Sequence, residues 1–200
     1  KYYIYRKTSS AKSWSRIGET TGTTYTDTKA TAGATYMYTI KAVKGSLTSG
    51  YNKTGWTYRF LKSPTHKSLS NANGAVVFSW NKVAGASGYI VYRKVNGAPT
   101  WTNLGKTTST SYTDKDVVNK SNYTYTVRAY YGSSLSNFYT GQVIKYMTAP
   151  TLKVANTTAG VKLEWEKVSG ASSYYIYRKA GSAKSWTKIA TVTRTYYTDY

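Results

Sequence analysis

Apolar and polar residues alternate along much of the chain with a period of two. Within 64–148, for example, Val76, Phe78 and Trp80 alternate with Val77 and Ser79. A period of two places successive side chains on opposite faces of a β-strand, whereas an amphipathic helix needs a period near 3.6. The pattern predicts no helix. It predicts strands at 67–71, 75–81, 88–95, 101–107, 110–113, 122–131 and 136–146.

Turn-forming residues separate these apolar runs at intervals of about 8 to 12 residues. They occur at Asn73-Gly74, Gly85-Ala86-Ser87-Gly88, Asn96-Gly97 and Gly132-Ser133. Thr, Tyr and Val dominate between them, and these residue types suit a pleated, half-buried surface. The spacing therefore predicts an all-β fold in which seven strands form two packed antiparallel sheets.

The chain is a repeat with a period near 86 residues. Tyr-Arg-Lys begins at Tyr5, Tyr92 and Tyr177, with spacings of 87 and 85 residues. Tyr-Thr-Asp and a single tryptophan recur at the same spacings, at Tyr25, Tyr112 and Tyr197 and at Trp14, Trp101 and Trp186. This period exceeds the 20 to 50 residues of solenoid repeats, so it indicates a tandem array of whole small domains.

The joints of the array lie at Pro64-Thr65 and Pro150-Thr151. Segment 64–148 is then one complete module, 1–63 lacks its first strands and 149–200 lacks its last strands. Short joints leave little slack, so we expect a semi-rigid stalk. Incomplete sandwiches expose an apolar face and unpaired edges. We therefore expect the end fragments to pair with further modules or with another copy.

The motifs of one unit resemble a fibronectin type III-like module. They are Val76-x-Phe78-Ser79-Trp80, then Ala86-Ser87-Gly88-Tyr89-x-Val91-Tyr92-Arg93, Tyr112-Thr113-Asp114 and Tyr123-x-Tyr125-x-Val127-x-Ala129. The nearest resemblance is to modules on surface and secreted proteins of Gram-positive bacteria. It implies tandem immunoglobulin-like, seven-stranded β-sandwiches in an extracellular protein. It says little about the ligand, because this fold serves many binding roles.

Several recurring residues have structural roles in such a module. Trp80 and Trp165 are expected between the sheets. Tyr36 and Tyr123 are expected to form tyrosine corners, in which a buried ring places its hydroxyl against upstream backbone. Three acids that end a strand, Asp27, Asp114 and Asp199, are expected to accept N–H bonds from the following turn.

The composition leaves little material for catalysis. There is no cysteine, one histidine (His66) and only seven acidic residues. Glycoside hydrolysis needs two facing carboxylates, and the only close pairs, Asp114/Asp116 and Glu164/Glu166, are two residues apart. His66 follows the first joint and is expected to be a solvent-exposed linker residue. We expect no enzymatic activity, no cofactor and no metal.

Net charge is the strongest global feature. Lys and Arg number 28 against 7 acids, a formal charge of +21. This predicts attraction to polyanions such as acidic glycans, anionic wall polymers or acidic proteins. The alternative is that the lysines serve solubility and protect sheet edges. No nucleic-acid motif is present, so sequence-specific nucleic-acid binding is not expected. No apolar stretch approaches the ~20 residues of a transmembrane segment.

An outward-facing set of aromatic and basic residues is the candidate ligand-binding face. If Tyr89 and Val91 face the core, Tyr92 and Lys94 face outward, and the repeat extends this set. Its members are Tyr5, Trp14, Lys41, Tyr92, Lys94, Trp101, Arg128, Tyr130, Tyr175, Tyr177 and Trp186. Exposed Tyr, Trp and Arg are enriched at binding hot spots, and such rings can stack on sugars. The alternative is structural: the rings shield the sheet through pairing with Lys and Arg stems.

These expectations support three hypotheses. The first is an extracellular adhesion array that engages a host protein, such as an immunoglobulin or a secreted glycoprotein, and also acts as a stalk. The second is a set of carbohydrate- or wall-binding modules of a larger glycan-active enzyme. The third is a spacer in which only length matters.

Overall fold

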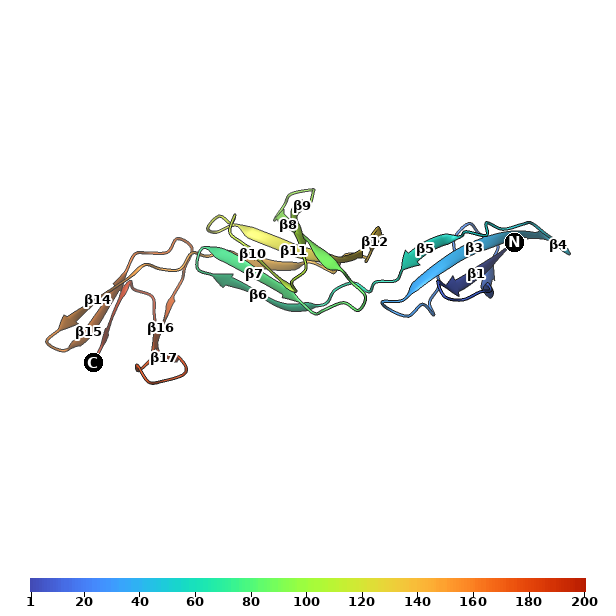
Figure 1. Cartoon of the computed structure of the whole chain (residues 1–200). Helices are drawn as coiled ribbons and strands as arrows, with labels where there is room; N and C mark the ends of the chain where they lie inside the picture. Colours follow the sequence, from blue (N-terminus) through green and yellow to red (C-terminus); the bar gives the residue numbers. More distant parts are fainter.

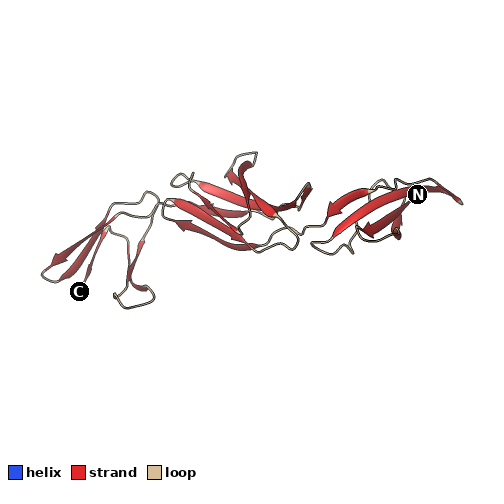
Figure 2. Cartoon of the chain, in the orientation of Figure 1, coloured by secondary structure: helices blue, strands red, loops and turns tan.

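The computed structural model describes residues 1–200, which form eighteen strands and no helix. Three modules lie end to end in an elongated row, with the N-terminus at one end and the C-terminal module at the other (Figure 1). Strands and loops make up the whole chain (Figure 2). No helix that could cross a membrane is found. The prediction of an all-β chain of tandem sandwiches is confirmed.

The central module consists of two antiparallel sheets. The first has the order β10 (Ser111–Asp114), β7 (Ala75–Trp80), β6 (His66–Ala72). The second has the order β9 (Thr102–Thr107), β8 (Gly88–Val95), β11 (Asn122–Tyr131). Two short strands, β12 (Ser134–Leu135) and β13 (Gln142–Lys145), both pair with β11. This is the arrangement of a fibronectin type III-like sandwich.

The core lies between these sheets because the inward positions of both are apolar. Phe78 and Trp80 of β7 meet Val91 of β8 and Tyr125 of β11, and all four are at most 1% exposed. The Trp80 ring centroid lies 5.2 Å from that of Phe78 and 5.3 Å from that of Tyr89. Trp80 therefore occupies the space between the sheets, as the sequence predicts, and Trp165 is buried likewise in the third module.

Both tyrosine corners are present. The hydroxyl of buried Tyr123 accepts the N–H of Val118 at 2.8 Å. In the first module the hydroxyl of Tyr36 accepts the N–H of Thr31 at 3.2 Å. Each ring thus satisfies a backbone donor five residues upstream while it fills the core.

The prediction of one continuous last strand over 136–146 is wrong. Strand pairing occurs only in β12 and β13, and the residues between them run irregularly beside β11. Two backbone bonds, from the Ser136 N–H to the Ala129 carbonyl and from the Tyr139 N–H to the Val127 carbonyl, remain there, and side chains of β11 add further bonds. The Thr126 hydroxyl donates to the Tyr139 carbonyl at 2.5 Å, and Arg128 Nε donates to the Ser136 carbonyl at 2.7 Å. These side-chain bonds satisfy backbone groups without strand geometry.

The expectation that His66 is an exposed linker residue is also wrong. His66 begins β6 and is half-buried. Its ring stacks between Phe78 and Tyr139, at centroid distances of 6.4 Å from each. The ring is drawn inward because it extends an aromatic cluster at the edge of the core.

The terminal modules contain fewer strands. The first is one sheet formed by β2 (Ser15–Thr20), β1 (Tyr2–Thr8), β3 (Thr35–Lys44), β4 (Leu47–Thr48) and β5 (Trp56–Arg59). The third has a sheet of β14 (Leu152–Thr157), β15 (Gly160–Trp165) and β18 (Tyr196–Asp199), and a hairpin of β16 (Tyr174–Arg178) and β17 (Thr187–Val192). The single sheet of the first module thus has no facing sheet.

The first and central modules touch through specific contacts. The guanidinium of Arg59 lies 3.6 Å from the ring centroid of Tyr131, and its Nη1 donates to the Gly85 carbonyl at 3.3 Å. The Tyr58 hydroxyl donates to the Leu135 carbonyl at 2.7 Å. Beyond Arg59, Leu61 packs into the core of the central module. These contacts anchor the joint on both sides.

Candidate ligand-binding face

The predicted aromatic and basic residues of the central module share the outer face of the sheet that contains β8 and β11. Tyr92 lies opposite Thr126 in the register, whereas its inward neighbour Val91 lies opposite Val127 and is fully buried. Tyr92, Lys94, Arg128 and Tyr130 are partly exposed, and Trp101 is exposed. The strand alternation therefore places them where the sequence predicts.

Three rings of this face, those of Trp101, Tyr130 and Phe138, are each paired with a cation. Lys94 Nζ lies 5.0 Å from the ring of Trp101, and Lys106 Nζ lies 5.1 Å from the ring of Tyr130. Arg128 Cζ lies 4.5 Å from the ring of Phe138. These distances are within the range of cation–π attraction, about 6 Å. The face therefore presents rings and positive charges side by side.

Sequence reasoning missed Phe138. Its ring meets Tyr92 edge to face, with centroids 5.3 Å apart. It was overlooked because 136–146 was expected to form a regular strand. The repeat contained the signal: Phe138 and Tyr51 are separated by the same 87 residues as the other markers of the first two modules.

The first module repeats this arrangement. Tyr51 stacks on Tyr5 and meets Trp14 edge to face, at centroid distances of 6.0 and 6.1 Å. Lys7 Nζ lies 5.2 Å from the Trp14 ring, and Lys41 Nζ lies 4.6 Å from the Tyr51 ring. Three aromatic rings and two lysines thus form one cluster.

Both tryptophans lie against a glycine near the last strand. A Cβ placed on Gly55 would lie 2.6 Å from Trp14 Cη2, and one on Gly141 would lie 3.3 Å from Trp101 Cη2. Each indole therefore has one part packed on backbone. These two contacts support a structural role for the tryptophan rings, which is compatible with a role in binding.

In the third module the corresponding residues are more open. Trp186 is 65% exposed, compared with 37% for Trp101. Lys179 Nζ lies 5.7 Å from the Trp186 ring, and Lys188 Nζ lies 4.5 Å from the Tyr175 ring. Tyr177 is also exposed. The cation–ring pairs form without the strands that flank them in the central module, so they are local features of the β16–β17 hairpin.

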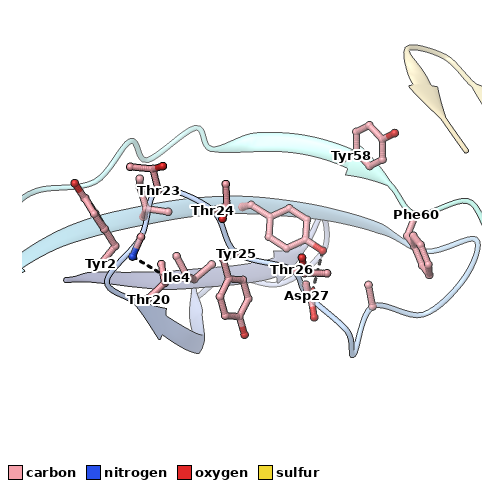
Figure 3. Close-up of a pocket in the computed structure, with 14 residues that line it drawn as sticks. Tyr2, Ile4, Thr20, Thr23, Thr24, Tyr25, Thr26, Asp27, Tyr58 and Phe60 are labelled. Carbon is pink, nitrogen blue, oxygen red and sulfur yellow. Dashed lines mark hydrogen bonds between the residues drawn. The ribbon is translucent and has the colours of Figure 1, made fainter. Parts of the chain in front are cut away.

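A hollow of about 680 Å³ lies on the opposite, inner face of the first module (Figure 3). Tyr2, Ile4, Tyr38 and Ile40 of β1 and β3 form its floor. In the central module the residues at these positions are buried beneath β6 and β7. The hollow is therefore the uncovered core side of a sandwich and differs in origin from a small-molecule pocket.

The charged groups near this floor have structural partners. Arg6 Nη1 donates to Asp27 Oδ2 at 2.8 Å, and the Tyr38 hydroxyl donates to the same oxygen at 2.9 Å. Burial opposes ionisation of Asp27, but the hydrogen bonds from Arg6, Tyr38 and the Lys29 N–H outweigh it, so the pKa of Asp27 is lowered. Burial and the bond to Asp27 together raise the pKa of Tyr38.

Three of the acidic residues in the two close pairs, Asp114, Asp116 and Glu164, have partners within the chain. Asp114 is engaged by Arg93 at 2.8 Å and by the Tyr125 hydroxyl at 2.7 Å, while Asp116 contributes its backbone carbonyl to Arg93. Glu164 forms an exposed ion pair with Lys162. No group of three or more His, Cys, Asp or Glu side chains converges as a metal site.

The chain is similar in sequence to a bacterial enzyme and in structure to a set of tandem modules. The chain is 34% identical over 130 residues to exoglucanase B of Cellulomonas fimi, a match that covers 57% of this chain and 11% of that protein. The chain thus spans about a tenth of the length of this relative. A crystal structure of the FN1–FN3 domains of chicken CNTN1 aligns over 98% of this chain and 77% of its own, with 17% identity and a TM-score of 0.38. No family profile matches the chain.

Proposed function

We propose that this array of fibronectin type III-like modules is a non-catalytic part of a larger extracellular bacterial protein that acts on glycans. In that protein the array spaces other domains and contributes weak glycan contacts through its outer faces. The observation that carries the proposal is the 34% identity over 130 residues to exoglucanase B. That length exceeds one repeat, so the similarity extends beyond a single module.

The outer face provides the chemistry of glycan contact. Edges and partly exposed faces of Trp14, Tyr92 and Trp101 can pack on sugar rings, while neighbouring lysines and arginines attract carboxylate, sulfate or phosphate substituents. A single face with so few open rings binds weakly. Repetition along a chain adds weak sites by multivalency, provided that they reach the same polymer.

The contacts at the first joint support the spacing role. Arg59 and Tyr58 tie the end of the first module to the central module. A joint with specific hydrogen bonds holds neighbouring modules at a restricted angle, whereas a Gly/Ser linker lets them tumble. The array thereby separates whatever lies at its two ends.

Affinity electrophoresis in gels that contain a soluble polysaccharide tests the proposal. We expect the chain to be retarded by an acidic polysaccharide at low salt, and less strongly by a neutral β-glucan. A variant with Tyr92→Ala and Trp101→Ala should lose most of the retardation. The matched control is Trp56→Ala, which removes a tryptophan that is 82% exposed but lies outside this face.

The same variants also test the first hypothesis, in which the partner is a host protein such as an immunoglobulin. Capture of one protein from serum at physiological salt, abolished by the Tyr92/Trp101 variant, would favour adhesion over glycan contact. Retardation that is unchanged in this variant and lost in high salt would show charge attraction alone, and would remove the proposed face.

A further inference from the structure

Two contacts fix the side chain of Arg128 on the outer face of the central module. Its Nε donates to the Ser136 carbonyl at 2.7 Å, and its Cζ lies 4.5 Å from the ring centroid of Phe138. Within the chain, neither Nη group makes a hydrogen bond or an ion pair. The guanidinium is therefore held in one orientation with its Nη edge open, and binding an anion there costs little further side-chain entropy.

Most other arginines already use an Nη group within the chain. Four of them pair with a carboxylate of their own module: Arg6, Arg16, Arg93 and Arg178. Arg59 donates through Nη1 to a backbone carbonyl at the first joint. Arg128 thus presents the donors that elsewhere in this chain hold a carboxylate, but without the carboxylate.

No acidic side chain shares the face with Arg128. The central module has two acids, of which Asp114 is buried and Asp116 follows β10 of the other sheet. Lys106 of β9 lies in the same cross-strand row as Arg128, because both are in register with Ile90 of β8. Neighbouring strands are about 4.8 Å apart, so these two backbone positions are roughly 10 Å apart. The row therefore carries two positive charges that no acid of the module neutralises.

The first module differs at both corresponding positions. Lys41 takes the place of Arg128, and Glu19 takes the place of Lys106. Glu19 pairs with two cations of its own module, so the charge of that face is partly neutralised. An ammonium is a compact point charge, whereas a guanidinium is a planar fork that matches two oxygens at once. The outer face of the central module is therefore better suited to recognise an anion by its shape.

Aromatic groups beside Arg128 can contact the rest of a ligand. The Tyr92 ring meets the Phe138 ring edge to face, with centroids 5.3 Å apart, and Tyr92 is partly exposed. A uronic acid carries its carboxylate directly on the sugar ring. When that carboxylate meets the Nη edge, the sugar lies near these rings and can pack on them.

We propose that Arg128 is a carboxylate-binding residue and that the outer face of the central module binds a polysaccharide of uronic acids. Nη1 and Nη2 donate in parallel to the two carboxylate oxygens. The sugar ring packs on Tyr92 and Phe138, and Lys106 attracts a further carboxylate of the same polymer. The proposal rests on the proposed glycan contact, because it names the class of glycan that the same face selects.

Affinity electrophoresis of the full chain in three polymers tests the proposal. The polymers are polygalacturonate, its neutral methyl ester and dextran sulfate, which separate carboxylate recognition from backbone contact and from charge alone. We expect polygalacturonate to retard the chain and its methyl ester to retard it about tenfold more weakly. Arg128→Lys keeps the charge but loses the fork, so the Kd for polygalacturonate should rise about tenfold. The Kd for dextran sulfate should change by less than about twofold.

Arg194→Lys is the matched control for this substitution. Arg194 also donates through Nε to a carbonyl, that of Tyr196 at 3.2 Å, and its Cζ lies 4.8 Å from the Tyr196 ring. It precedes β18, which belongs to the other sheet of the third module, so its replacement should leave the Kd unchanged. Lys41→Arg provides a gain: it places a guanidinium at the Arg128 position of the first module and should strengthen binding to polygalacturonate. A folding defect cannot produce that gain.

The outcomes separate this proposal from the proposed glycan contact. Equal retardation by polygalacturonate and its methyl ester, an unchanged Kd in Arg128→Lys, or equal weakening for dextran sulfate would overturn the carboxylate site. The glycan contact would still stand if the Tyr92/Trp101 variant lost its retardation in the same gels. A chain that none of the three polymers retards would overturn both.

Discussion

Arg93 and Asp114 connect the two sheets of the central module. Arg93 lies on β8, Asp114 ends β10, and Nη1 of the arginine is 2.8 Å from Oδ2 of the carboxylate. The two residues are 21 positions apart. The same separation joins Arg6 to Asp27 and Arg178 to Asp199. The two most regular tripeptides of the sequence, Tyr-Arg-Lys and Tyr-Thr-Asp, are therefore partners in one ion pair per module.

We predict that Asp114→Ala destabilises the central module by about 3 kcal/mol. The substitution leaves Arg93 with a mostly buried, unpaired charge, and breaking such a pair costs about 3 to 5 kcal/mol. It also removes the acceptor of the Tyr125 hydroxyl. Native-state hydrogen exchange of β7 and β8 amides measures the effect on this module alone.

The third module provides the control for this prediction. The Arg178 side chain is 61% exposed, so its pair with Asp199 is largely solvated. Asp199→Ala should therefore change the stability of β15 by about 1 kcal/mol or less. If Asp114→Ala and Asp199→Ala lowered the free energy of unfolding equally, burial would not determine the strength of the Arg–Asp pair.

The first module should lose stability in acid. The pKa of Asp27 is lowered in the folded state, so the folded protein binds its proton less readily than the unfolded chain, whose Asp has a pKa of about 3.9. The resulting stability is present above that value and disappears as pH falls through the folded pKa. A carbon-detected NMR titration of the Asp27 carboxyl, with Arg6→Gln as the comparison, measures the shift directly. Arg6→Gln should move the pKa back toward its ordinary value, and an unchanged pKa would contradict the assigned cause.

The interior was predictable because burial leaves a strong period-two signal. Trp80 and Trp165 were placed between the sheets from their position in alternating runs, and Tyr36 and Tyr123 were placed in tyrosine corners. The Asp27 and Asp114 braces were predicted too: Asp27 accepts the N–H of Lys29 and Asp114 that of Asp116. The ion pairs were missed because their residues lie far apart in the chain, and pairing across two sheets has no local signature.

The outer face was predicted in part. The alternation of apolar and polar residues predicts that Tyr92, Lys94 and Arg128 point outward, because their strand neighbours point into the core. Phe138 was missed because the last strand is interrupted by side-chain bonds from Thr126 and Arg128, and local propensity does not reveal such bonds. His66 was misplaced since its burial depends on Tyr139, which the fold brings from a distant segment.

Gly141→Ala should destabilise the central module by roughly 1 to 3 kcal/mol, the usual cost of overpacking. The new Cβ would lie 2.6 Å from Thr124 Cγ2 and 3.3 Å from Trp101 Cη2. Adding Thr124→Ser removes the nearer methyl group and should restore most of the loss. Thermal unfolding of the single and double variants measures both effects. A double variant as unstable as Gly141→Ala alone would show that the clash with Thr124 does not cause the loss.

Removal of the Arg59 side chain should loosen the joint between the first and central modules without unfolding either. Arg59→Ala eliminates the stacking on Tyr131 and the hydrogen bond to the Gly85 carbonyl, whereas Leu61 stays in the core of the central module. The modules then tumble more independently, and residual dipolar couplings of the two should no longer fit one alignment tensor. Lys145→Ala is the matched control, because Lys145 is exposed and occupies the equivalent position before the second joint. It should leave the couplings of the first and central modules unchanged. A single tensor that persists in the Arg59→Ala variant would show that chain connectivity at 61–65 restrains the modules and that the arginine clamp does not.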